Sequence, residues 1–232
     1  MNDTNVSNSP KTPSVGARIS NSSPEPLPQA FDSHDFRLRL TCDVCTSYEP
    51  DDAITDYSGE IVAYGDHGDQ MIGKIALRVV DLDASQDSVF DVLDCVDQET
   101  ADHLVLFDAD GQFSPAVGRV LDEEDTPSTN LLLIDRIEIL PQARGRGLAP
   151  LILNLLSRKF RNTCRLAVLK PFPLQYGSAF ERHKNTWEER MGYKHFDADQ
   201  KKALRKLKKL YRTAGFVPVP RTDYMVRDLY EQ

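Results

Sequence analysis

The chain has 232 residues and a formal net charge of -8 at pH 7, with a pI near 5.2. An acidic chain is poorly suited to nonspecific nucleic-acid binding, and no apolar run approaches the roughly 20 residues of a membrane span, so we expect no nucleic-acid and no membrane partner. The length suffices for one domain with a sizeable core, and we expect a cytoplasmic monomer or homodimer with reduced cysteines.

The first 30 residues are rich in Asn, Ser, Pro and Thr and contain almost nothing to bury. This composition predicts a disordered N-terminal tail over residues 1–30, followed by one domain over residues 31–232. The tail lacks the apolar core of a signal peptide. A Ser-rich start is also compatible with export by a specialised secretion apparatus, although most such tails are only tails.

Two β-rich stretches come next in the chain. The alternation from Phe36 to Cys45 predicts a half-buried strand, and the stretches Glu60–Tyr64 and Met71–Leu82 predict a hairpin. Cys42 and Cys45 have metal-ligand spacing, but neither a second Cys pair nor a nearby His pair accompanies them. We therefore expect no metal site.

A region of short apolar clusters separates this hairpin from the next strand. The clusters from Val89 to Leu106 predict one or two short helices, and Pro115–Leu121 predicts another, so that Ser85–Leu121 reads as an insertion. The acidic run Asp122–Asp125 could attract a cationic acceptor. A solvated acidic surface that aids solubility is the commoner role of such a run.

The stretch Leu131–Leu156 is the most informative, because an apolar strand leads through a Gly-bearing turn into an apolar helix. The first N–H groups of a helix have no partner inside it. The helix dipole adds roughly half a positive charge at the same end. The turn Gln142–Gly147 therefore predicts a cradle for an anion, most naturally a phosphate or pyrophosphate.

The residues of this turn suit such a ligand. Gly145 and Gly147 permit close backbone approach or a positive φ angle at little steric cost. Arg144 and Arg146 add positive charge. Pro150 is tolerated about one turn into a helix, which predicts that the helix begins near Gly145.

Two familiar phosphate loops do not fit this turn. A Walker A loop requires a Lys after its second Gly, and a Rossmann loop requires three spaced glycines with an acidic residue about 20 positions on. The pattern that fits is Gln or Arg, two residues, Gly, one residue, then Gly or Ala, which Gln142, Gly145 and Gly147 satisfy. This pattern, placed between a strand and a helix, resembles the acetyl-CoA-binding motif of the GNAT superfamily of N-acetyltransferases.

A second block near the C-terminus has the same resemblance. Apolar residues recur at helical spacing from about Asp199, and Gly215 stands where a left-handed helix cap belongs. Tyr211–Phe216 is similar to the closing helix of the family, in which a tyrosine lies four residues before Gly-Phe and a strand follows. Between the two blocks, Cys164–Lys170 predicts a buried strand, and Asp223–Leu229 predicts the last strand.

The resemblance implies a mixed α/β (α+β) sheet, with the GNAT-like acyl-CoA N-acyltransferase fold and a helical insertion before the central strand. The family usually places its helices after the first strand, so the insertion is a departure. The segment Phe172–Phe196, which contains Trp187, is a second departure and could form a lid, an acceptor wall or a packed insertion. The implied activity is acetyl transfer from acetyl-CoA, as co-substrate, to an amine-bearing small molecule or protein.

The resemblance also places the cofactor. The strand that ends at Ile139 and Leu140 would part from the strand Leu166–Leu169, and backbone groups on the edge opened there would hold the acetyl carbonyl and pantetheine. Backbone N–H groups of the turn would hold the pyrophosphate. The basic face Lys201–Lys209 is most simply the wet side of a helix, although one or two of its lysines could meet the 3'-phosphate of CoA. The expected cofactor-binding residues are Ile139, Leu140, Gln142, Ala143, Arg144, Gly145, Arg146, Gly147 and Leu148.

Catalysis requires a base and an acid. A free alkyl ammonium has a pKa near 10.4, so a carboxylate must remove its proton before attack, and a positioned acid must protonate the departing thiolate. Asp135 stands where the family often carries a glutamate, and Glu138 is the runner-up; strand alternation places the two on opposite faces unless a bulge intervenes. Arg136 could instead neutralise either one in a structural ion pair. Tyr211 matches the thiolate-protonating tyrosine of the family, and its alternative role is a core aromatic.

Three hypotheses stay open at this point. The chain is an amine N-acetyltransferase, a catalytically silent CoA-binding module with a regulatory or interaction role, or an unrelated protein that binds another phosphate at the helix N-terminus. The acceptor and the acyl chain length do not follow from the sequence.

Overall fold

The computed structural model describes residues 27–44, 50–65, 68–121, 128–177 and 186–230. Most of the predicted tail, Cys45 and the acidic run Asp122–Asp125 lie outside the described residues. The strands are β1 (Phe36–Cys42), β2 (Ile54–Ala63), β3 (Gln70–Val80), β4 (Leu131–Ile139), β5 (Leu166–Leu169), β6 (Val217–Pro218) and β7 (Met225–Asp228). The helices are η1 (Pro50–Ala53), α1 (Val89–Asp94), α2 (Gln98–Ala101), η2 (Asp102–Leu106), α3 (Pro115–Gly118), η3 (Pro141–Ala143), α4 (Leu148–Phe160), η4 (Leu174–Tyr176), α6 (Thr186–Met191), η5 (Tyr193–His195) and α7 (Gln200–Thr213).

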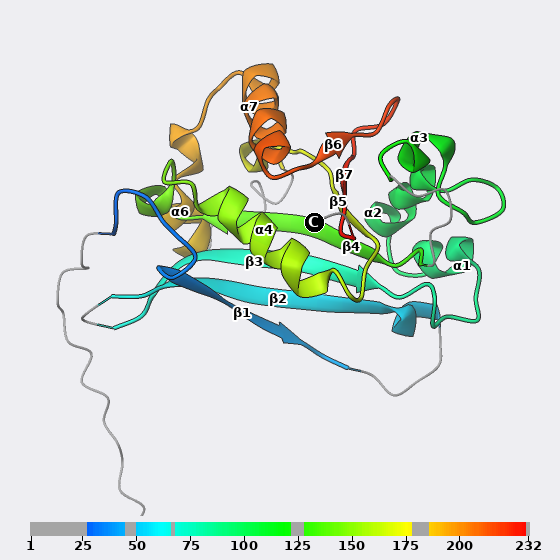
Figure 1. The fold of residues 1–232 in the computed structure, drawn as a ribbon. Helices are drawn as coiled ribbons and strands as arrows, with labels where there is room; N and C mark the ends of the chain where they lie inside the picture. The colour runs from blue at the N-terminus through cyan, green and yellow to red at the C-terminus, as the bar shows by residue number, and fades with distance from the viewer. Residues whose placement is uncertain (1–26, 45–49, 66–67, 122–127, 178–185, 231–232) are drawn as a thin grey trace, which may run out of the picture.

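The strands form one mixed sheet in the order β1-β2-β3-β4-β5-β7-β6 (Figure 1). Consecutive strands from β1 to β4 pair antiparallel with one another. Strand β4 pairs parallel with β5, and β7 pairs antiparallel with both β5 and β6. A parallel pair needs a crossover connection, and α4 supplies it between β4 and β5. The predicted mixed α/β sheet, with a helical insertion before the central strand, is confirmed.

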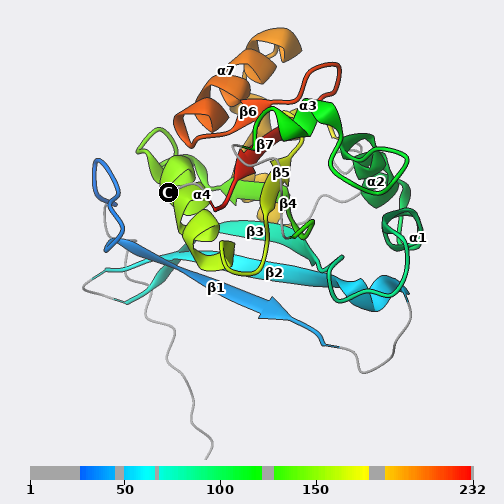
Figure 2. The same cartoon turned by 45° about the vertical axis from the view of Figure 1, so that its right-hand side comes forward.

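The two faces of the sheet carry separate cores. On one face, Leu132 and Ile134 of β4 pack with α4 and with the C-terminal end of α7. On the other face, Leu131 and Leu133 pack with the insertion helices α1 to α3, which gather at one end of the sheet (Figure 2). Because both faces are covered, the first four residues of β4 form a continuous apolar run and are all buried. Among the described residues, no helix has both the length and the apolarity that a membrane crossing would need.

The starts of α4 and β2 differ from the sequence prediction. Helix α4 begins at Leu148 and not near Gly145, because Gly147 precedes it with a left-handed backbone, φ 78°. Strand β2 begins at Ile54, well before the predicted Glu60. Its first half carries polar residues on a partly exposed face, so it lacks the apolar alternation that marks a strand.

Candidate functional site

A β-bulge in β4 sets the direction of the candidate bases. The register with β3 pairs Ala76 with Arg136 and Leu77 with Ile134, which leaves Asp135 as the extra residue. A bulge reverses the inward and outward alternation beyond it. Asp135 therefore lies on the face of the sheet opposite α4, together with Glu138.

Strand β4 loses its parallel neighbour halfway along its length. It pairs with β5 only from Leu131 to Leu133, so the edge of β4 beyond Leu133 is open toward the side of β5. The N–H of Leu140 donates to the carbonyl of Ile72 on β3, at 2.8 Å. Backbone groups alternate in direction along a strand, so the N–H and C=O of Ile139 point to the open edge, where the C=O already accepts from Nε of Arg144 at 2.7 Å. Of the two residues predicted to hold the thioester and pantetheine, Ile139 faces the opening and Leu140 is bonded within the sheet.

The turn after β4 ends in a pair of left-handed glycines, Gly145 with φ 73° and Gly147 with φ 78°. The N–H groups of Ala143 and Arg144 are used inside the turn, where they donate to Leu140 and Pro141. Within the described part of the chain, no hydrogen bond is formed by the N–H groups of residues 145–147. A Cβ atom at either glycine would meet nothing within 4 Å. Free amides, open space and a helix N-terminus together fit an anion.

The helix start identifies a further part of this cradle that the sequence reading missed. The same pattern of Gln or Arg, two residues, Gly, one residue, Gly or Ala is also met two positions later, by Arg144, Gly147 and Ala149. This second register places Gly147 at the cap of α4 and Ala149 in its first turn, where amides have no partner inside the helix. The motif alone contained that signal, and Ala149 joins the candidate cofactor contacts.

The two arginines of the turn bind other parts of the chain. Arg144 donates to the carbonyls of Ile139 and Met191, both at 2.7 Å, and lies 4.2 Å from the centre of the Phe196 ring. Both arginines place positive charge near the cradle, but their guanidinium groups donate hydrogen bonds to backbone carbonyls of the chain.

Arg146 ties the N-terminal segment (Leu27–Phe31) to the turn. Its guanidinium donates to the carbonyl of Leu27, at 2.6 Å, and to that of Pro28, while its own carbonyl accepts from the N–H of Phe31 at 3.1 Å. The Phe31 ring is buried in the core under α4. The turn is therefore supported from outside by a segment that lies more than 100 residues earlier in the sequence.

Asp135 is held by an arginine of the neighbouring strand. Arg78 donates from Nε and Nη2 to the two carboxylate oxygens, at 2.9 and 3.0 Å. Burial raises the pKa of Asp135 above its usual range, and the guanidinium of Arg78 offsets part of this rise. The Asp135 side chain is 22% exposed. It therefore combines raised basicity with partial access, but both of its oxygens are occupied.

Glu138 is more enclosed and anchors the segment that precedes α7. Its carboxylate accepts from the indole Nε1 of Trp187 at 2.8 Å and from the hydroxyl of Tyr193 at 2.9 Å. The guanidinium of Arg136 lies 3.6 Å from the Glu138 carboxylate. Lys74 is the cross-strand partner of Glu138, and its Nζ lies 4.5 Å from the centre of the Trp187 ring. The segment from α6 to η5 thus covers the end of β4. It is part of the segment Phe172–Phe196, for which a lid, an acceptor wall or a packed insertion was predicted, and residues 178–185 of that segment lie outside the described residues.

Tyr211 lies in the last turn of α7, where it packs against the core under α4. Its ring is 6.4 Å from that of Phe216. Burial raises the pKa of Tyr211 to about 12. The hydroxyl is therefore protonated throughout the physiological range, as a proton donor must be. The same packing also fits a core aromatic, so the catalytic role of Tyr211 stays a prediction.

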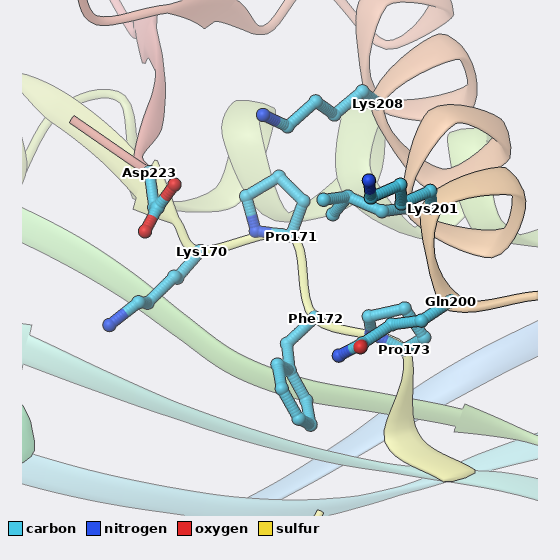
Figure 3. Close-up of a pocket in the computed structure, with 9 residues that line it drawn as sticks. Lys170, Pro171, Phe172, Pro173, Gln200, Lys201, Lys208 and Asp223 are labelled. Carbon is cyan, nitrogen blue, oxygen red and sulfur yellow. The ribbon is translucent and has the colours of Figure 1, made fainter. Parts of the chain in front are cut away.

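Four of the lysines of α7 lie in two different surroundings. Lys202 and Lys206 pair with Asp197, at 3.4 and 3.0 Å. Lys201 and Lys208 line a pocket of about 260 Å³ between α7 and the segment that follows β5 (Figure 3). The other residues around this pocket are Lys170, Pro171, Phe172, Pro173, Gln200, Leu204 and Asp223.

Comparison with known proteins finds no sequence relative and only weakly similar solved structures. No family model and no curated protein matches the chain. Among solved structures, NAA60 of Arabidopsis thaliana in complex with acetyl-CoA is 13% identical, with a TM-score of 0.38 over 74% of this chain and 76% of that one. A mutant of KacT is 9% identical, with a TM-score of 0.38 over 83% and 95%. The KacTA–DNA complex gives 9% identity and a TM-score of 0.37 over 83% and 94%.

The seven-stranded mixed sheet is of the kind that the motif resemblance implies. The described chain has the parts that the motif resemblance implies: a central strand that leads through the glycine turn into α4, and a closing helix α7 before the last strands. The insertion α1 to α3 stands between β3 and β4. Identities and TM-scores as low as these carry no conclusion about the fold or the activity of this chain.

Proposed function

We propose that the chain is an acetyl-CoA-dependent N-acetyltransferase, which moves the acetyl group to a primary amine by direct attack. One arrangement supports the proposal above all. The free amides of residues 145–147 at the start of α4 adjoin the edge of β4 that β5 leaves open. An anion cradle next to an unpaired strand edge suits a pyrophosphate joined to an amide-bearing arm, which is the form of CoA.

The proposed chemistry uses one base and one acid. The amine loses a proton to Asp135, directly or through a water molecule, and its nitrogen then attacks the thioester carbonyl. The C–N bond forms, the C–S bond breaks, and the departing thiolate takes a proton from the hydroxyl of Tyr211. The nitrogen, which becomes cationic on attack, loses its second proton through water, and that proton restores the Tyr211 hydroxyl. The N–H of Ile139 lies on the open edge and is suited to bind the carbonyl oxygen as negative charge develops there. Each proton-transfer role contributes roughly 10² to 10⁴ in rate.

A second candidate is a CoA-binding module without turnover. It is favoured by the engagement of both candidate bases, because Arg78 takes both oxygens of Asp135 and two aromatic donors take those of Glu138. Binding without catalysis would suit a regulatory or interaction role. Under this alternative the carboxylates serve to fix the sheet and its covering segments.

Two measurements test and separate these functions. Calorimetric titration with acetyl-CoA should give a defined affinity, and thiol release with a panel of amines should exceed release without an acceptor. Binding without acceptor-dependent thiol release would favour the silent module. No binding at millimolar acetyl-CoA would remove both functions and leave a site for a different phosphate.

A further inference from the structure

The helical insertion reaches the candidate base through one buried arginine. Arg78 lies on β3, is only 6% exposed, and projects from the face that also carries Asp135. A buried guanidinium is stable only when it is paired and hydrogen-bonded. Two of its donors go to Asp135, in the two-point geometry that fixes a carboxylate in one orientation.

The third donor of Arg78 turns toward α2 of the insertion. Nη1 contacts the hydroxyl of Thr100 and lies 3.4 Å from a carboxylate oxygen of Asp97. Asp97 is itself fixed, because it caps α2 by accepting from the N–H of Thr100 at 2.6 Å and from its hydroxyl at 2.8 Å. The position of the guanidinium is therefore set by the insertion as well as by the sheet.

We infer that Arg78 is a positioning residue, through which Asp97 and Thr100 of the insertion fix the orientation of the Asp135 carboxylate for proton removal. The inference rests on the proposed function. It gives the insertion a part in the reaction: α2 holds the arginine that holds the base. Arg78 touches neither co-substrate nor acceptor in this scheme and acts only through Asp135.

The charges around Asp135 predict the direction in which its pKa changes when Arg78 is replaced. Arg78 is the cation that favours its carboxylate form, while Glu99 of α2 and Asp56 of β2 act in the opposite direction. Removal of the Arg78 charge therefore raises the pKa of Asp135, since a nearby opposite charge shifts a carboxyl group by about one to three units. A base acts as the carboxylate, so the acidic limb of the rate profile moves to higher pH.

The experiment compares Arg78→Gln, Arg78→Lys and Asp97→Asn in the full chain. For each variant, kcat/KM is measured from pH 5 to 9 with an amine that the wild type acetylates, together with the Kd for acetyl-CoA. The Asp135 carboxyl is also titrated directly by ¹³C NMR, with Asp135→Asn used for assignment. This last reading does not depend on turnover.

We expect Arg78→Gln to move the acidic limb and the Asp135 titration upward by about one unit or more, with the Kd for acetyl-CoA unchanged. Arg78→Lys keeps the positive charge, so its acidic limb should lie close to that of the wild type. Its kcat/KM should stay lowered, because an ammonium cannot make the two-point contact with Asp135. Asp97→Asn should lower kcat/KM several-fold, since it loosens Arg78 from one side. Its side chain is 51% exposed, so the variant is expected to fold.

The outcomes separate this inference from the proposed function. The inference is overturned if the wild type is active and if Arg78→Gln has its acidic limb and its Asp135 titration at the same pH as the wild type. If Arg78→Gln does not fold, an unchanged kcat/KM in both Arg78→Lys and Asp97→Asn would overturn it as well. A wild type that releases no thiol with any amine would instead overturn the proposed function, whatever the NMR titration shows.

Discussion

Asp135 and Glu138 lie on the same face of the sheet although they are three residues apart on β4. The bulge at Asp135 reverses the alternation, so that Asp135 meets Arg78 and Glu138 stands opposite Lys74 of the same neighbouring strand. Both candidate bases thus lie on one side of the open edge. Their surroundings differ: Asp135 is linked to the helical insertion, and Glu138 is linked to the segment before α7.

This difference predicts separate effects for the two carboxylates. Asp135→Asn should lower kcat by 10² or more and leave acetyl-CoA binding intact, because it removes a base. Glu138→Gln should mainly lower stability, by about 1–3 kcal/mol, because the charged acceptor of the Trp187 and Tyr193 donors is lost. Rate assays and urea unfolding distinguish the pair. A larger loss of kcat in Glu138→Gln than in Asp135→Asn would reverse the assignment.

The left-handed glycine at the start of α4 predicts a loss of affinity on substitution. Gly147→Trp forces a bulky L-residue into a positive φ, at a cost of about 1–3 kcal/mol, and tilts the amides of the cradle. Acetyl-CoA affinity measured by calorimetry should fall at least about ten-fold, as 1.4 kcal/mol is a factor of ten. Gly118→Trp is the matched control, because a Cβ there also meets open space. Equal affinities in the two variants would contradict a backbone cradle.

Loss of a single hydroxyl tests the proposed acid. Tyr211→Phe keeps the packing of the ring and removes the proton donor, so kcat should fall by about 10² to 10⁴ with little change in acetyl-CoA affinity or Tm. Tyr64→Phe is the control, because Tyr64 is exposed and distant from Tyr211 in the sequence. Turnover at the wild-type rate in Tyr211→Phe would leave this residue as a core aromatic.

The N-terminal segment (Leu27–Phe31) is predicted to preorganise the cradle. Arg146→Ala removes the contacts with the carbonyls of Leu27 and Pro28, and Phe31→Ala removes the buried ring that anchors the same segment. Either change should weaken acetyl-CoA several-fold, because the turn would lose its outer support. Arg37→Ala controls for the loss of one positive charge. The support is not needed if Phe31→Ala binds acetyl-CoA as tightly as the wild type.

His103 predicts a loss of stability in acid. Burial lowers its pKa to about 4 from an ordinary 6.5, so the unfolded chain takes up a proton that the folded chain does not. The stabilisation is complete above pH 6.5 and is lost as the pH falls from 6.5 toward 4, by about 3 kcal/mol in all. His103→Gln should flatten this part of the curve of unfolding free energy against pH. His34→Gln, at an exposed position, should leave the slope as in the wild type.

Local signals were sufficient for the elements that carry the site. The apolar run of β4, the glycines after it and the capped periodicity of α7 all follow from neighbouring residues, and each lies where it was predicted. Asp199 accepts from the N–H of Lys202, as a helix cap does. Gly215 has φ 81°, as a left-handed helix end requires.

The partners of the site residues could not be predicted in the same way. The contact between Arg78 and Asp135 spans 57 positions, and that between Arg146 and Leu27 spans 119. Both depend on which strands lie side by side and on where the β4 register slips. A bulge leaves no mark in the apolar pattern, because Asp135 and Arg136 are both polar. The sequence therefore located the carboxylates without showing that both would be engaged.

The backbone at Gly147 has a consequence for chemical protein synthesis. A Cβ atom added at this residue meets no atoms within 4 Å, so the position restricts the handedness of a small residue and not its space. D-amino acids favour the positive φ that L-residues resist. A semisynthetic chain with D-alanine at this position is thus expected to keep the shape of the cradle, where its mirror-image counterpart L-alanine would distort it.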